Sequence, residues 1–113
     1  MSNIKALRQK AFLSQNGRCH YCGCPMWEHD PTSFAKQHGI SLKTTRRLQS
    51  TAEHLIARQD GGSDTAGNVV AACLHCNAHR HLGRQASAPS AERYRARVQM
   101  LVSRGRWPTA RFA

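Results

Sequence analysis

Residues 69–81 read VVAACLHCNAHRH, a short apolar run followed by a Cys-x2-Cys pair and a polar segment rich in histidine. VVAA predicts a short buried strand, and the pattern from about Leu74 predicts a helix that ends at Gly83. Cys73 and Cys76 therefore lie where the strand turns into the helix. A Cys-x2-Cys knuckle supplies two of the four ligands of a tetrahedral zinc, so this stretch requires a second pair.

The second pair is Cys19 and Cys22, which also have two residues between them. The chain has five cysteines, and an odd number without an apolar secretory signal in residues 1–13 argues against a disulfide scaffold. We predict that the two pairs form a structural Zn²⁺ site, with buried free thiols as the alternative. Cys24 is expected to be a packed or semi-exposed thiol and not a ligand. Because residues 23–72 lie between the knuckles, a metal here closes a long loop and stabilises a small domain.

The chain is strongly basic, with 17 Lys and Arg against 6 Asp and Glu in 113 residues and a net charge of +11. The positive charge gathers in residues 1–49 and 77–113, whereas residues 50–76 carry a small acidic excess. This balance favours a polyanionic partner, and we expect DNA rather than a membrane. A basic surface that only keeps a small protein soluble is the alternative. No apolar run approaches the length of a membrane span, and we expect a cytoplasmic protein.

One domain is expected over residues 1–113, divided into an N-terminal helix (1–18), a zinc-stapled core (19–84) and a basic C-terminal helix and tail (86–113). The pattern predicts, in chain order, a helix over 3–15, a short helix at SFAKQH (33–38), an exposed basic loop at KTTRR (43–47), a strand over 51–56, a turn-rich loop over 59–68 and a helix over 90–105. A guanidinium fork matches two phosphate oxygens, and the expected phosphate contacts are Arg46, Arg47, Arg80 and Arg84.

An acid stands directly before a histidine in STAEHLIARQDGGS (50–63), as Glu53 and His54. Adjacent residues on a regular strand point to opposite faces of the sheet. The two side chains can therefore serve one site only if the backbone twists or the strand ends there. The loop that begins after Ala57 makes such an ending plausible.

The order of these features resembles the HNH endonucleases: Glu53-His54, then Gly61-Gly62, Asn68, the Cys73-x2-Cys76 knuckle and Asn77. The resemblance covers residues 19 to about 84, and several independent features agree in order and spacing. It implies an α+β fold with a small ββα-metal (His-Me finger) core, stapled by the structural zinc and flanked by helices. It also implies a metal-dependent endonuclease that hydrolyses phosphodiester bonds of DNA.

The resemblance assigns a role to each residue of this signature. His54 is the general base that takes a proton from the attacking water, and Glu53 is a ligand of the catalytic divalent cation. Asn77 is a second ligand, and Asn68 braces the loop and orients the histidine. In colicin-type relatives two helix positions one turn apart bind metal, so His81 is a candidate third ligand. A solvated or phosphate-touching histidine is the alternative for His81.

The chemistry of phosphodiester hydrolysis agrees with this set of residues. The reaction needs a deprotonated water, together with positive charge near the phosphoryl and leaving oxygens. Carboxylate and amide oxygens suit Mg²⁺, whereas an imidazole ligand would favour Mn²⁺, Ni²⁺ or Zn²⁺.

Two other classes of function stay open. One is a non-catalytic zinc-stapled module that binds nucleic acid through its basic arms. The other is a toxin of the same fold, which would have a secretion domain or an immunity partner. The sequence also does not choose among restriction, phage genome processing and DNA repair as the biological role. It leaves open whether RNA is a substrate, whether one or both strands of DNA are cut, and whether the protein forms a homodimer.

Overall fold

The computed structural model of the protein describes residues 3–82 and 88–109. Its elements are, in chain order, α1 (Ile4–Ser14), α2 (Pro31–His38), α3 (Leu42–Arg47), β1 (Ser50–His54), the 3-10 helix η1 (Arg58–Asp60), β2 (Val69–Cys73), α4 (Leu74–His81) and α5 (Ala91–Ser103). The predicted strand-loop-strand-helix order is confirmed in β1, β2 and α4, with β1 ending at His54 instead of Ile56. Gly83, the predicted end of the helix that begins near Leu74, lies outside the described residues.

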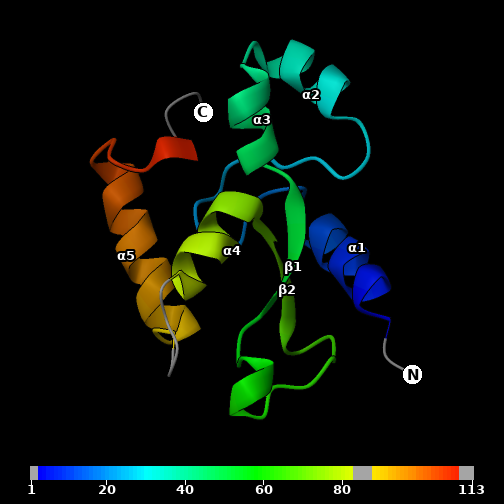
Figure 1. The fold of residues 1–113 in the computed structure, drawn as a ribbon, viewed down its shortest axis with the longest axis vertical. Helices are drawn as coiled ribbons and strands as arrows, with labels where there is room; N and C mark the ends of the chain where they lie inside the picture. The colour runs from blue at the N-terminus through cyan, green and yellow to red at the C-terminus, as the bar shows by residue number, and fades with distance from the viewer. Residues whose placement is uncertain (1–2, 83–87, 110–113) are drawn as a thin grey trace.

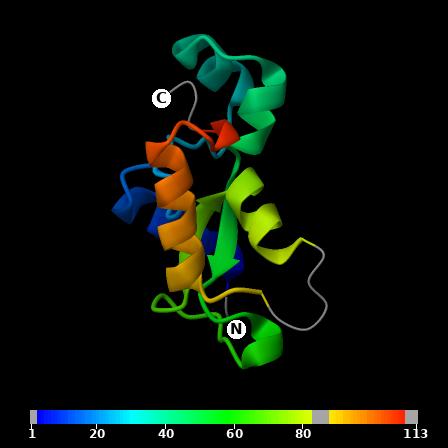
Figure 2. The ribbon, with the colours of Figure 1, turned by 90° about the vertical axis from the view of Figure 1, so that its left-hand side faces the viewer.

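The two strands form an antiparallel sheet at the centre of the molecule (Figure 1). His54 is paired with Val69 and Ser50 with Cys73, so the end of β2 lies beside the start of β1. Helix α1 lies on one side of the strands, and α4 and α5 lie on the other, with α5 outermost (Figures 1 and 2). The fold is therefore the predicted α+β arrangement, a ββα unit with flanking helices.

The segment 41–48 differs from its prediction, because KTTRR is not an exposed loop but most of helix α3. Ser41 caps the helix, and its side chain accepts a hydrogen bond from the backbone N–H of Thr44. Thr45 is buried, and its carbonyl oxygen accepts a hydrogen bond of 2.7 Å from the indole of Trp27. Packing of Thr45 and Leu48 into the core stabilises a helix that the basic composition alone does not indicate.

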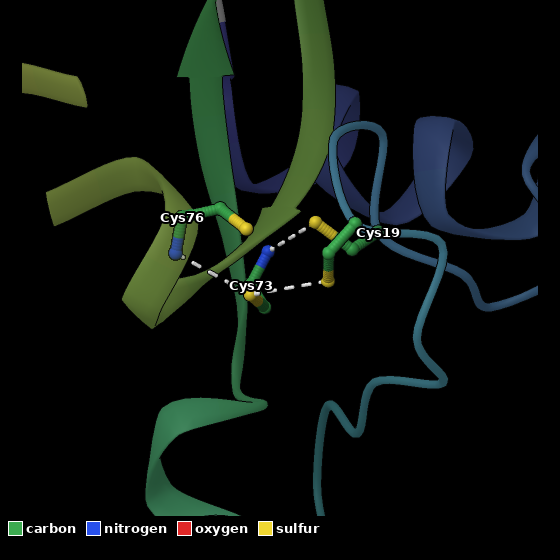
Figure 3. Close-up of side chains that lie close together, drawn as sticks. Cys19, Cys73 and Cys76 are labelled. Carbon is green, nitrogen blue, oxygen red and sulfur yellow. Dashed lines mark hydrogen bonds between the residues drawn. The ribbon is translucent and has the colours of Figure 1, made fainter. Parts of the chain in front are cut away.

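The four cysteines of the two knuckles meet in the core, where all four are buried. Their Sγ atoms lie within 4.8 Å of one another, and those of Cys22 and Cys73 are 3.9 Å apart. Tetrahedral zinc with Zn–S bonds of about 2.3 Å places its sulfur ligands about 3.8 Å apart, so the cluster fits a metal such as zinc. Cys19, Cys73 and Cys76 approach one another from the first knuckle, the end of β2 and the start of α4 (Figure 3).

The electrostatics of this cluster also favour a bound cation. Hydrogen bonds from the neighbouring cysteines, Cys19 first, lower the pKa of Cys22. Hydrogen bonds with Cys19, Cys22 and Cys73, followed by burial, raise the pKa of Cys76, with Cys19 as the largest cause. Adjacent thiols therefore cannot all ionise together, and a divalent cation between them removes this conflict.

The segment after α5 covers the cysteine cluster. The indole of Trp107 donates a hydrogen bond of 3.3 Å to Sγ of Cys76, and the hydroxyl of Thr109 donates one of 3.4 Å to Sγ of Cys22. The thiol of Cys24 donates to the carbonyl of Thr109 instead of joining the four, as predicted for a packed thiol. Trp107 and Thr109 are thus joined to the core by hydrogen bonds with the cysteines.

The core is small and centred on this cluster. Tyr21, Leu48 and Val98 are fully buried, and they come from the first knuckle, the end of α3 and α5. Within the described part of the chain, none of the helices has the length and apolar character that crossing a membrane requires. A metal held by the four cysteines would therefore join elements that share only a small apolar interior.

Replacement of one metal-binding cysteine should unfold the domain. We expect Cys73→Ser to lower the zinc content and to abolish cooperative thermal unfolding, because metal binding and folding are coupled in so small a core. Cys24→Ser is the matched control and should keep one zinc per chain. The zinc-to-protein ratio and the melting curve measure the effect, and a zinc-free Cys73→Ser protein with parental melting would contradict the four-cysteine site.

Candidate active site

Glu53 and His54 are the last two residues of strand β1, and their side chains differ in burial. Glu53 is buried, whereas the His54 side chain is 16% exposed. After His54 the chain leaves the strand, as the use of both side chains in one site requires. Both residues line a cleft of about 530 Å³, which is bounded by Ala52, Glu53, His54, Ala57, Arg58, Gln59, Asn77 and His81. The structure thus brings four of the predicted site residues, Glu53, His54, Asn77 and His81, to one cleft.

The two carboxylate oxygens of Glu53 have different surroundings. Oε2 accepts hydrogen bonds from the Tyr21 hydroxyl at 2.9 Å and from Nη1 of Arg80 at 3.0 Å. Oε1 lies 3.2 Å from Nε2 of His81. Burial, followed by the Glu53 charge, raises the pKa of Tyr21, so its hydroxyl keeps the proton that it donates. One oxygen is therefore held by the interior, and the other adjoins His81 at the cleft.

Arg80 does not have the geometry of a phosphate contact, which corrects its predicted role. Its side chain is 4% exposed, and all three guanidinium nitrogens donate inside the protein. Nε donates to the Pro89 carbonyl, Nη2 to the Leu55 carbonyl, and Nη1 to Glu53 and the His54 carbonyl. Arg80 therefore holds the end of β1, and its charge compensates the buried carboxylate.

A signal for the buried position of Arg80 is present in the sequence. Arg80 follows Cys76 by four residues, so on a helix the two side chains share a face. Cys76 belongs to the buried metal-binding cluster. That face of α4 must therefore point to the interior, and Ala78 on the opposite face is exposed.

Asn77 and His81 occupy the face of α4 that borders the cleft. The amide nitrogen of Asn77 donates to the carbonyl of Ala52 and the hydroxyl of Thr51, both at 3.1 Å. Because Ala52 offers only an acceptor there, the carbonyl oxygen of Asn77 is the atom left for a ligand. The side chain of His81 is 39% exposed, so its ring can reach both Glu53 and solvent.

Asn68 makes three hydrogen bonds within the loop between the strands. Its Oδ1 accepts from the backbone N–H of Ile56 at 2.8 Å. Its Nδ2 donates to the carbonyls of Ile56 and Ser63, both at 3.0 Å. Asn68 is not among the residues that border the cleft.

The Gly61-Gly62 turn is a steric requirement of the same loop. Gly61 has φ of +92°, a conformation that favours glycine. A Cβ atom on Gly62 would lie 1.7 Å from the carbonyl oxygen of Ile56. The loop can therefore close against Ile56 only with glycine at this position.

Sequence reasoning missed the residues that contact His54 from the loop. Oδ1 of Asp64 lies 2.7 Å from Nε2 of His54, and Arg58 donates to both carboxylate oxygens of Asp64, at 3.2 and 3.0 Å. Asp64 comes two residues after the Gly-Gly turn, in GGSD. A Gly-Gly turn can fold the loop back toward the histidine, so an acid just after it was the signal that could have predicted this contact. Tyr21, the partner of Glu53, was also missed.

The other predicted phosphate contacts do not border the cleft. Arg46 is exposed and Arg47 half-buried on α3, and neither is among the residues that border the cleft. Helix α3 lies at the start of β1 (Figure 1). Arg84 lies outside the described residues. Arg46 and Arg47 therefore stay predicted phosphate contacts that lie apart from the cleft.

Removal of Arg80 should destabilise the fold instead of only weakening a surface contact. We expect Arg80→Met to lower the free energy of unfolding by about 3–5 kcal/mol, because Glu53 would stay buried without its charged partner. Arg97→Met on α5 is the control, since Arg97 is exposed, and should change stability little. Urea denaturation measures both, and an Arg80→Met protein of parental stability with weakened DNA binding would restore the phosphate-contact interpretation.

Comparison with known proteins identifies the family. The model of the HNH endonuclease family matches residues 19–83, which span both knuckles, the cleft and α4. Searches of curated proteins and of solved structures gave no match. The family match covers more than half of the chain and includes Glu53, His54, Asn68 and Asn77. The chain belongs to the HNH endonuclease family.

Proposed function

We propose that the protein is a metal-dependent endonuclease that hydrolyses phosphodiester bonds of DNA. The observation that carries the proposal is the single cleft bordered by Glu53, His54, Asn77 and His81. These side chains provide a base and a set of cation ligands at one place. Membership of the HNH endonuclease family supports a nuclease-type function, and the net charge of +11 favours a polyanionic substrate.

His54 is the proposed general base. Its ring borders the cleft, and its side chain is partly exposed, so a water molecule can reach it. The ring takes a proton from the water that attacks phosphorus, and such assistance is worth about 10²–10⁴ in rate. The carbonyl of His54 is fixed by Nη1 of Arg80 at 2.9 Å, which limits movement of the backbone beneath the ring.

Three side chains would hold the catalytic divalent cation: Glu53 through Oε1, Asn77 through its carbonyl oxygen and His81 through Nε2. The 3.2 Å between Oε1 of Glu53 and Nε2 of His81 fits two neighbouring ligands, which lie about 3 Å apart around a cation at about 2.1 Å. When bound, the cation would supply positive charge to the phosphoryl and leaving oxygens. A nitrogen ligand beside two oxygens suits Mn²⁺, Ni²⁺ or Zn²⁺ as well as Mg²⁺.

Plasmid cleavage tests the proposed reaction. We expect the zinc-loaded protein to cleave plasmid DNA when Mg²⁺, Mn²⁺, Ni²⁺ or Zn²⁺ is added and to stop when EDTA is added. His54→Ala should keep the zinc, the melting curve and DNA binding while the cleavage rate falls about 10²–10⁴-fold. His79→Ala is the matched control, because His79 is an exposed histidine on the opposite face of α4. Parental cleavage by His54→Ala would remove the catalytic role of His54, whereas DNA binding without cleavage by the parental protein would favour a zinc-stapled module that only binds nucleic acid.

The proposed ligands should respond to metal concentration. We expect Asn77→Ala and His81→Ala each to raise the divalent cation concentration for half-maximal cleavage, with partial recovery of the rate at saturation. These variants are cleaner than Glu53→Ala, which would also leave Arg80 without its charged partner. A metal titration of the cleavage rate measures the effect, with His79→Ala again as the control. An unchanged metal requirement in both variants would exclude them as ligands.

A further inference from the structure

Asp64 contacts His54 from outside the cleft. Oδ1 of Asp64 lies 2.7 Å from Nε2 of the ring, yet Asp64 does not border the cleft itself. The Asp64 side chain is 20% exposed and is held from a second direction by Arg58. The carboxylate that meets the ring thus belongs to a residue that is not one of the proposed cation ligands.

The short distance decides which ring nitrogen carries the proton. Two acceptor atoms 2.7 Å apart would repel, so Nε2 must donate a proton to Oδ1 of Asp64. Arg58 does not favour the other tautomer, because its Nε lies 3.4 Å from Nε2 and closer, at 3.2 Å, to Oδ1 of Asp64. Its Nη2 donates to Oδ2 of Asp64 at 3.0 Å, so the guanidinium fork belongs to the carboxylate.

The second ring nitrogen is then the basic one. Nδ1 of His54 makes no hydrogen bond within the described residues. In the described part of the chain, the one buried side-chain nitrogen or oxygen without a hydrogen-bond partner is Ser50 Oγ. Nδ1 of His54 has no partner and is not that atom, so it is not buried. Nδ1 therefore reaches solvent with its lone pair free.

We propose that Asp64 is the positioning residue of His54: it accepts the Nε2 proton and so keeps the Nδ1 lone pair available to the attacking water. This inference rests on the proposed nuclease function. In the reaction, a water proton moves to Nδ1 while the water oxygen bonds to phosphorus and the bond from phosphorus to the leaving oxygen breaks. The leaving oxygen takes a proton from solvent, and His54 later returns its extra proton to solvent. Asp64 stabilises the cationic ring in between.

The position of Asp64 is set by the braced loop. Nδ2 of Asn68 donates to the carbonyl of Ser63, the residue before Asp64, at 3.0 Å. The same amide is paired with Ile56, two residues after His54. Asn68 therefore connects the backbone beside the histidine with the backbone beside its acid, which is a physical route by which Asn68 orients His54.

The state of the ring tests the proposal directly. In zinc-loaded protein labelled with ¹⁵N-histidine, without a catalytic cation, the neutral His54 ring should carry its proton on Nε2. His54→Gln identifies the signals. Asp64→Ala should give a mixture of both tautomers, whereas Asp64→Asn should keep the Nε2 proton, because an amide oxygen also accepts it. Asp60→Asn, the same change at an exposed acid of the same loop, should leave the spectrum unchanged.

Cleavage kinetics provide the second measurement. We expect Asp64→Ala to lower kcat about 10-fold or more while KM for DNA and the metal requirement stay parental, and Asp64→Asn to recover part of the loss. A neutral wild-type ring with its proton on Nδ1, or parental kcat in Asp64→Ala, would overturn the proposal. If the wild-type protein does not cleave DNA, the proposed function fails, and the ring spectrum still decides whether Asp64 positions His54.

Discussion

The cluster of four cysteines is the constraint on which the rest of the structure depends. Residues 23–72 lie between the two knuckles, and the buried core is small. By joining the first knuckle to the end of β2, the cluster brings Tyr21 beneath Glu53, a residue on a different element. Trp107 donates to Sγ of Cys76 and Thr109 to Sγ of Cys22, so the segment after α5 contacts the cysteine cluster directly. A metal at this place closes a long loop in the unfolded chain and anchors three segments in the folded one.

The buried Glu53–Arg80 pair connects this scaffold to the cleft. A buried ion pair contributes little net stability, because both charges lose their hydration, but removal of one partner is costly. Here the geometry explains why the pair is useful: Arg80 and Tyr21 hold one oxygen of Glu53, and the other stays beside His81. Arg80 also binds the carbonyls of His54 and Leu55, where the strand must end for two adjacent side chains to reach one cleft. The same guanidinium therefore fixes both the proposed ligand and the backbone of the proposed base.

The loop between the strands acts as a second support. Asn68 pairs with both backbone groups of Ile56 and reaches Ser63, and Gly62 allows the chain to pass close to the carbonyl of Ile56. These contacts involve backbone groups, so they position the loop independently of the side chains that it displays. The result is a frame in which one cleft is bordered by residues from β1, the loop and α4.

The sequence by itself determined the parts of this protein that depend on local spacing. The two Cys-x2-Cys pairs, the adjacent Glu53 and His54, and the order of strand, loop, strand and helix all follow from residues close together in the chain. Only the tertiary structure decided which partners these residues have. Arg80 was predicted to contact phosphate and is instead buried against Glu53, KTTRR forms a helix because Thr45 is buried, and Asp64 reaches His54 through the fold of a loop. The physical reason is that burial and long-range hydrogen bonds arise only when distant segments pack, and no local pattern specifies them.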